Sequence, residues 1–150
     1  MKPLILGMGS PILSDDGIGL YVADCLQDRF HGVDVVTTAM AGLNVLDILE
    51  GYDKVFLIDA VTSRNGNIGD LKKLTSEEGT LHLFSSHGIN FFELLQLGKE
   101  MGLHLPEIGA VYGIEIGDRV EFSEHLTSTM KGKVSDIIKR ISEDIALHLN

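Results

Sequence analysis

The chain is short of cysteine, proline and positive charge, and each shortage excludes a class of protein. It has one cysteine in 150 residues, so no internal disulfide can form and a reducing compartment is the expected setting. Only 3 prolines and 44% hydrophobic residues are typical of a folded globular chain. Its 12 lysine and arginine residues face 22 acidic residues, giving a net charge of −10 at pH 7. Because nucleic acids and anionic membrane surfaces attract clustered positive charge, we expect neither as a partner.

Long apolar segments are also missing. The N-terminal run in MKPLILGMGSP is too short for the core of a signal peptide, and no run approaches the ~20 residues of a membrane span. We therefore expect a cytoplasmic, monomeric protein in which residues 1–150 form one domain. The lone cysteine, Cys25, lies among apolar positions of a predicted helix, where we expect a small buried thiol without a catalytic role.

Short apolar runs alternate with amphipathic stretches along the chain. Apolar and β-branched runs predict strands at Leu4–Met8, Val33–Thr37, Lys54–Ala60 and Ile108–Ile116, with a brief edge strand at Leu71–Leu74. Apolar residues three and four apart predict helices from Ile18 towards Gly32, over Leu43–Leu49, from Ser85 or Ser86 to Gly102, and over Met130–Leu149. This alternation predicts an α/β fold with a mostly parallel sheet and helices on both faces. The segment from Gly66 to Thr75 is too short for a crossover helix, so one strand there should be antiparallel.

The most unusual stretch is GMGSPILSDDGIG, residues 7–19, at the junction of the first strand and the first helix. Glycine-rich turns at such junctions usually bind phosphate, but Asp15 and Asp16 would repel it. The third glycine position of a GxGxxG pattern is Ile12, and no lysine follows the last glycine as in a P-loop. The two acids therefore either cap the helix or face a cation.

Two further residues are expected at the same edge of the sheet. Asp59 ends the third strand, and His87 opens a later helix. Parallel strands bind ligands at their carboxyl ends, near the point where strand order reverses, and the first and third strands should be neighbours there. Carboxylates and a neutral imidazole suit a divalent transition metal such as zinc or nickel. Each residue also has a structural explanation, since an aspartate can cap a helix or bond loop amides and a first-turn histidine is often structural.

A serine hydrolase is a weaker alternative. Ser14, His87 and Asp59 could form a triad, but the chain has no GxSxG nucleophile elbow.

The stretch LGMGSPILSDDGIG resembles the N-terminal signature of the [NiFe]-hydrogenase maturation endopeptidases, roughly GxGNxLxxDDGxG. The stretches FLIDAV, with Asp59, and SSHGIN, with His87, resemble the second and third characteristic stretches of that family. The resemblance covers essentially the whole chain. It implies a three-layer α/β/α sandwich with a five-stranded, mostly parallel sheet, and the removal of a C-terminal peptide from a nickel-loaded hydrogenase large-subunit precursor.

The same resemblance implies that the metal contacts are Asp16, Asp59 and His87. For the chemical step two routes are open: a carboxylate, with Asp16 as the candidate, activates the attacking water, or the metal polarises the carbonyl or lowers the pKa of the water. The metal would be nickel supplied by the precursor, with none held tightly by the free protein. Two departures stand out: Ser10 replaces the usual asparagine, and TTAMAG, residues 37–42, replaces an acidic DGGT turn associated with substrate recognition. The missing acid in TTAMAG keeps open a non-catalytic nickel-sensing module or chaperone for the precursor. A metallohydrolase that keeps its own zinc is a third, weaker alternative.

Overall fold

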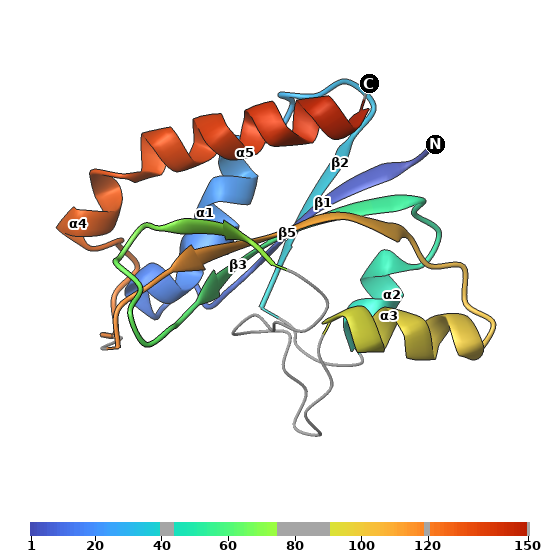
Figure 1. Cartoon of the computed structure of the whole chain (residues 1–150), viewed down its shortest axis with the longest axis horizontal. Coiled ribbons are helices and arrows are strands. Elements are labelled where there is room, and N and C mark those ends of the chain that lie inside the picture. Colours follow the sequence, from blue (N-terminus) through green and yellow to red (C-terminus); the bar gives the residue numbers. More distant parts are fainter. Residues whose placement is uncertain (40–43, 75–90, 119–120, 150) are drawn as a thin grey trace.

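The structure is a computed structural model that describes residues 1–39, 44–74, 91–118 and 121–149. The described residues form one five-stranded sheet with the strand order β2-β1-β3-β5-β4 (Figure 1). The strands are β1 (Pro3–Met8), β2 (Asp34–Thr38), β3 (Lys54–Val61), β4 (Leu71–Lys73) and β5 (Glu107–Glu115). Neighbouring strands are parallel except β4 and β5, which are antiparallel. The predicted mostly parallel sheet with an antiparallel edge strand is confirmed.

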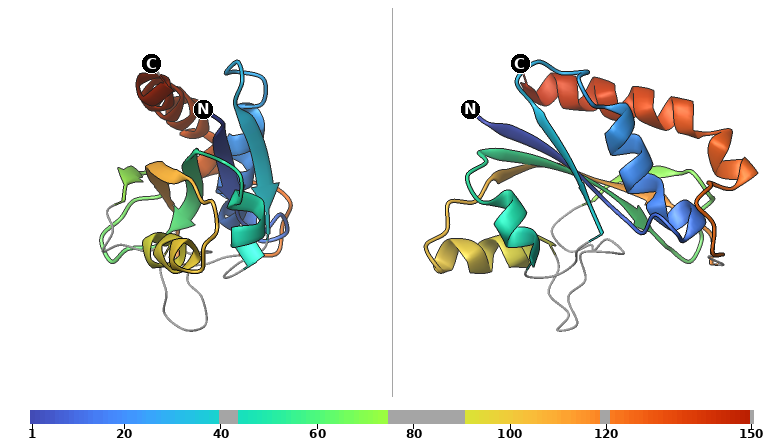
Figure 2. Two further views of the ribbon diagram at one scale, coloured as in Figure 1. Left: turned by 90° about the vertical axis from the view of Figure 1, so that its right-hand side faces the viewer. Right: turned by 180° about the vertical axis from the view of Figure 1, so that it is seen from behind.

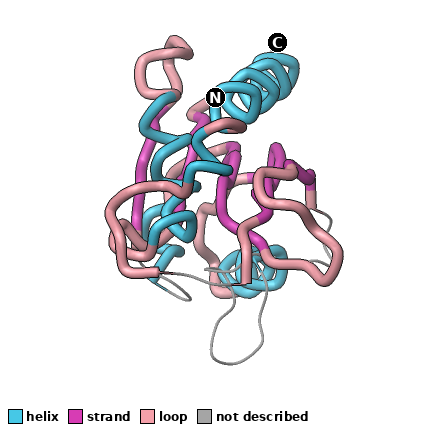
Figure 3. The backbone as a smooth tube through the Cα atoms, turned by 90° about the vertical axis from the view of Figure 1, so that its left-hand side faces the viewer, coloured by secondary structure: helices cyan, strands magenta, loops and turns pink. Residues whose placement is uncertain are grey.

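Helices cover both faces of this sheet. They are η1 (Ser14–Gly17, a 3-10 helix), α1 (Ile18–Cys25), α2 (Val45–Leu49), α3 (Phe91–Glu100), α4 (Ser128–Lys131) and α5 (Val134–Leu149). α1 and α5 lie on one face and α2 and α3 on the other, and the end-on view has the strands between the helices (Figures 2 and 3). The expected three-layer α/β/α sandwich is therefore confirmed. No helix in the described part of the chain is long and apolar enough to cross a membrane.

Some boundaries differ from the sequence-based prediction. The first helix ends at Cys25, well before Gly32, and the single helix predicted over Met130–Leu149 is two helices, α4 and α5, separated at Gly132 and Lys133. The helix expected to begin at Ser85 or Ser86 is described from Phe91 onward as α3, because residues 75–90 lie outside the described residues.

Successive residues of the central strands pack on opposite faces of the sheet. Ile5 of β1 and Ile58 of β3 lie in the core under α1 and α5, and Leu6 and Leu57 lie in the core over α2 and α3. These side chains are fully buried. Because both faces are covered, β1 and the Val55–Ile58 part of β3 are continuous apolar runs, and these runs identified both strands in the sequence.

Glycines bring the start of α1 directly against the ends of two strands. A Cβ at Gly19 would lie 2.3 Å from the carbonyl oxygen of Met8 and 2.5 Å from that of Ile58. A Cβ at Gly7 would lie 2.5 Å from the Gly19 carbonyl oxygen. Only glycine allows this approach, so these two members of the glycine-rich stretch serve close packing between helix and sheet.

Cys25 is exposed, which corrects the expectation of a buried thiol. The buried side of α1 consists of Ile18, Gly19, Val22 and Ala23, and Cys25 lies off that stripe at the last residue of the helix. Partial burial and, to a smaller extent, the Asp24 carboxylate raise the pKa of the Cys25 thiol. A raised thiol pKa argues against a nucleophilic role at neutral pH, in agreement with the prediction that Cys25 is not catalytic.

Candidate functional site

Asp16 lies where the chain turns from β1 into α1. It belongs to η1, its side chain is 4% exposed, and its Oδ2 accepts a hydrogen bond from the backbone N–H of Ser10 at 3.2 Å. A Cβ at Gly9 would lie 2.6 Å from the Asp16 carbonyl oxygen, and one at Gly17 would lie 2.7 Å from the Ser10 carbonyl oxygen. The loop therefore folds tightly back on itself, and the two glycines that permit this hold Asp16 in place.

The neighbouring Asp15 has a different role. Its Oδ1 accepts a hydrogen bond from the backbone N–H of Thr127 at 2.8 Å, and its Oδ2 accepts one from the Thr127 hydroxyl at 2.7 Å. The Thr127 Oγ1 in turn accepts the backbone N–H of Met130 at 3.3 Å and so caps α4. Neither aspartate caps η1 with its side chain, so the simple capping explanation of the acidic pair is wrong. Asp15 instead ties the loop to a segment more than one hundred residues away.

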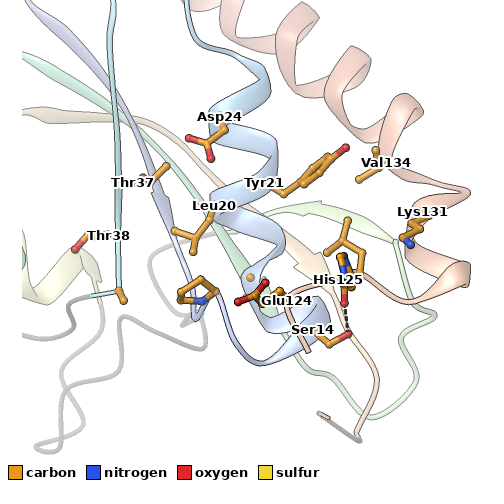
Figure 4. A pocket seen from close by; sticks show the side chains of 14 residues that line it. Ser14, Leu20, Tyr21, Asp24, Thr37, Thr38, Glu124, His125, Lys131 and Val134 are labelled. Atoms are coloured by element: carbon orange, nitrogen blue, oxygen red, sulfur yellow. Dashed lines mark hydrogen bonds between the residues drawn. The ribbon is translucent and has the colours of Figure 1, made fainter. Parts of the chain in front are cut away.

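Further backbone contacts join the same two segments. The backbone N–H of Ser14 donates to the Ser123 carbonyl at 2.8 Å, and the N–H of Ser123 donates to the Ile12 carbonyl at 3.0 Å. The Ser14 hydroxyl donates to the His125 carbonyl at 2.8 Å (Figure 4). These bonds hold residues 123–127 against residues 9–17, which we call the acidic loop. No local sequence pattern indicates this contact.

Asp59 is completely buried in β3. It lies opposite Gly113 of β5, its Oδ1 accepts the backbone N–H of Ala60 at 2.8 Å, and the strand continues two residues beyond it to Val61. By strand alternation its side chain lies on the same face as Leu57, the face covered by α2 and α3. The element η1 packs against β3, so the segments carrying Asp16 and Asp59 meet at the carboxyl end of the sheet.

The third predicted ligand, His87, lies outside the described residues, shortly before α3 begins at Phe91. Within the described residues, no group of three histidine, cysteine or acidic side chains is arranged to hold a metal ion. The structure thus brings together the elements of two predicted ligands. The strand order reverses between β1 and β3, so η1 and β3, which carry Asp16 and Asp59, lie at the predicted switch point.

Sequence reasoning missed a further buried acid, Glu115. This last residue of β5 is 1% exposed and lies beside Val61 in the register of the sheet. Its Oε2 accepts the backbone N–H of Ser63 at 2.8 Å, its Oε1 accepts the Ser63 hydroxyl, and the Lys72 Nζ lies 3.9 Å away. Glu115 therefore anchors the loop that follows β3. In the sequence, the position of Glu115 as the only acid in the apolar run GAVYGIEI indicates that it is buried.

A cleft of about 690 Å³ lies beside the acidic loop (Figure 4). It is bounded by α1, the end of β2, residues 124–126 and the junction of α4 with α5. Ser14 and Gly17 form part of its wall, and these residues flank Asp15 and Asp16 in the chain. The cleft volume falls within the range of roughly 300–1,000 Å³ that is usual for ligand sites.

Known proteins resemble this chain along most of its length. The HycI family model, described as hydrogenase maturation protease, matches residues 20–144. The hydrogenase 2 maturation protease of Escherichia coli K12 is 23% identical over 147 residues, which cover 94% of this chain and 88% of that protein. The solved structure of the hydrogenase maturating endopeptidase HybD from E. coli has a TM-score of 0.72 at 20% identity, with 94% and 90% of the two chains covered. That of the [NiFe] hydrogenase maturation protease HybD from Thermococcus kodakarensis has a TM-score of 0.67 at 22% identity, with 97% and 99% covered.

Proposed function

This chain belongs to the hydrogenase maturation protease family, and from that membership we propose that it cuts a C-terminal peptide from the nickel-loaded large-subunit precursor of a [NiFe]-hydrogenase. The observation that carries the proposal is that two buried carboxylates, Asp16 and Asp59, belong to elements that contact each other at the carboxyl end of the sheet. Buried carboxylates in such a position suit a divalent cation, and an added imidazole suits nickel.

In the proposed reaction the metal arrives with the substrate. Asp16, Asp59 and His87 bind the nickel that is already seated in the precursor, and this contact fixes the scissile peptide bond against η1. A precursor without nickel has no metal ion for the three side chains to bind, so cleavage follows metal insertion. The dependence on nickel would thus act as a check that the precursor is complete.

We assign Asp16 as the general base. Its carboxylate takes a proton from the water that attacks the scissile carbonyl, the C–N bond breaks, and the proton passes to the leaving amine. The precursor's nickel can assist by polarising the carbonyl oxygen. The tight loop formed by Gly9 and Gly17 holds the carboxylate in place before substrate binds, which lowers the cost of reaching a productive geometry.

The direct test is to incubate the protein with precursor prepared with and without nickel and to measure the intact mass of the large subunit. We expect shortening of the nickel-loaded precursor only. Asp16→Asn, Asp59→Asn and His87→Ala should each slow cleavage about 10- to 100-fold or more, by comparison with losses known for residues that support metal ligands. Asp34→Asn is the matched control, because Asp34 begins β2 at the amino end of the sheet. Normal cleavage by all three site variants would contradict the assignment.

A second candidate function is a nickel-sensing module that binds the precursor without cutting it. The observation in its favour is the absence of an acid in TTAMAG, where the family usually has an acidic turn. An intact precursor in a stable complex with this protein would support the module. A metallohydrolase that keeps its own zinc would instead retain near-stoichiometric metal after gentle purification, which metal analysis measures.

A further inference from the structure

We propose that the cleft beside η1 receives an extended segment of the precursor adjoining the scissile bond. This inference rests on the proposed function and adds to it the place where the substrate chain lies. The cleft and the acidic loop share a wall, since Ser14 and Gly17 of η1 line the cleft and Asp16 lies between them in the chain. A chain lying in the cleft therefore passes beside η1, the element that carries Asp16.

Exposed apolar side chains occur in the cleft lining and close to it in the chain. Ile12, which follows the cleft-lining Pro11, is 53% exposed, and Phe122 is 86% exposed. The hydrogen bond from the Ser123 N–H to the Ile12 carbonyl brings these two segments together. Tyr21, 46% exposed on α1, lies in the cleft wall itself. Large apolar side chains gathered at one exposed place mark an interaction surface, and aromatic ones contribute most to binding.

The polar lining of the cleft favours a peptide. The carboxylates of Asp24 and Glu124 occur in the same lining as Lys131 and His125. This mixed charge gives no advantage to a polyanion, whereas it suits the alternating donors and acceptors of a polypeptide. The proposed precursor is a polypeptide and therefore has these donors and acceptors.

The end of β2 offers backbone groups to an extended chain. β2 is an edge strand of the described sheet. The Thr38 carbonyl accepts the Gly9 N–H at 3.3 Å and so faces β1, and by strand alternation the backbone groups of Thr37 face the outer edge. Val35, on that same edge, uses its carbonyl to accept the Gln27 side chain at 3.3 Å. Thr37 lines the cleft, so an extended segment in the cleft can pair with its backbone as an added strand.

The opposite wall is fixed before substrate arrives. The contacts of Asp15 with Thr127 and of Ser14 with His125 hold residues 123–127 against the acidic loop. A preformed wall lowers the ordering cost of binding. Asp15 is thus a positioning residue that aligns the cleft with its neighbour Asp16.

The experiment places the photo-crosslinking amino acid p-benzoylphenylalanine at position 21, and separately at position 122, of the full chain. Each protein is irradiated with nickel-loaded precursor, and the crosslinked peptides are identified by mass spectrometry. We expect crosslinks to the residues that flank the scissile bond. Phe122→Ser should raise KM about tenfold with little change in kcat, the pattern of a lost binding contact. Leu147→Ser is the matched control, since Leu147 is 74% exposed and lies about 20 Å along α5 from the cleft-lining Val134.

The outcomes separate this inference from the proposed function. Normal cleavage with crosslinks elsewhere on the precursor, or only to a second copy of this chain, would overturn the cleft assignment and leave the peptidase intact. Crosslinks to the C-terminal segment without any cleavage would support the cleft and refute the peptidase. Equal KM values for Phe122→Ser, Leu147→Ser and the unaltered protein would also count against the cleft.

Discussion

At the scale of single residues, two adjacent acids have separate tasks. Asp16 is the proposed nickel contact and base, whereas both oxygens of Asp15 bind Thr127. Both carboxylates are buried within one turn of 3-10 helix. A comparison of Asp15 with Asp16 by the same substitution therefore separates a stabilising contact from a chemical one.

We expect Asp15→Asn to lower the free energy of unfolding by about 1–3 kcal/mol, because one buried partner of Thr127 is weakened or lost. Urea unfolding followed by circular dichroism measures this. Thr127→Val should have a similar effect, and the double variant should lose less than the sum of the two, since both changes remove the same contact. Strictly additive losses would show that the two side chains do not interact.

At the scale of elements, the position of α1 depends on glycine. The helix begins so close to β1 and β3 that a single added carbon at Gly19 would meet the backbone of both strands. Because η1 leads directly into α1, a shift of the helix also moves Asp16.

Gly19→Ala should therefore destabilise the protein by about 1–3 kcal/mol, as overpacking of a dense interior does, and should slow precursor cleavage. Thermal unfolding and the cleavage assay measure the two effects. Gly132→Ala is the control, because its added Cβ would meet only ordinary contacts at 3.6 Å and its φ is −70°. If both alanine variants were equally stable, the close approach of α1 to the strands would not be a constraint.

Helices and strands could be predicted where their burial requires a run or a regular spacing of apolar residues, and were predicted less well where it does not. Runs such as KVFLIDAV revealed β3 because both faces of the sheet are covered, and the short loop before β4 indicated its antiparallel direction. Met130 and Val134 are four residues apart, so the apolar spacing runs across the break between α4 and α5 and does not reveal it. The partners of Asp15 and Glu115 lie 112 and 52 residues away, so only the folded chain reveals them. The metal site stays a prediction: η1 and β3, which carry Asp16 and Asp59, contact each other as it requires, whereas His87 lies outside the described residues.

At the scale of the whole molecule, one carboxylate links three elements. Asp144 of α5 accepts a hydrogen bond from the Tyr112 hydroxyl of β5 at 2.5 Å and one from the Lys73 ammonium of β4 at 3.1 Å, and the His148 Nδ1 lies 3.7 Å away. Burial opposes ionisation of Asp144, but these hydrogen bonds and neighbouring charges outweigh it and hold its pKa below the usual value. The ionised carboxylate is thus bound more strongly in the folded state than in the unfolded one.

A lowered pKa in the folded state contributes stability that is present above the unfolded pKa, about 3.9, and is lost as the pH falls through the lower, folded value. Asp144→Asn should therefore lower the free energy of unfolding at pH 7, and the difference from the unaltered protein should shrink below about pH 4. Urea unfolding between pH 7 and pH 3 measures the trend. Asp136→Asn, on the same helix with a 71% exposed side chain, should change stability little at any pH.

The exposed position of Cys25 has a practical consequence. As the sole thiol of the chain, it can carry one fluorescent dye without any engineered substitution. It follows Asp24, whose side chain lines the cleft, so the dye would sit close enough to change its emission when that space fills. Its raised pKa makes mildly alkaline buffer the favourable condition for coupling with maleimide or iodoacetamide. The chain thus carries its own attachment point for following substrate entry in real time.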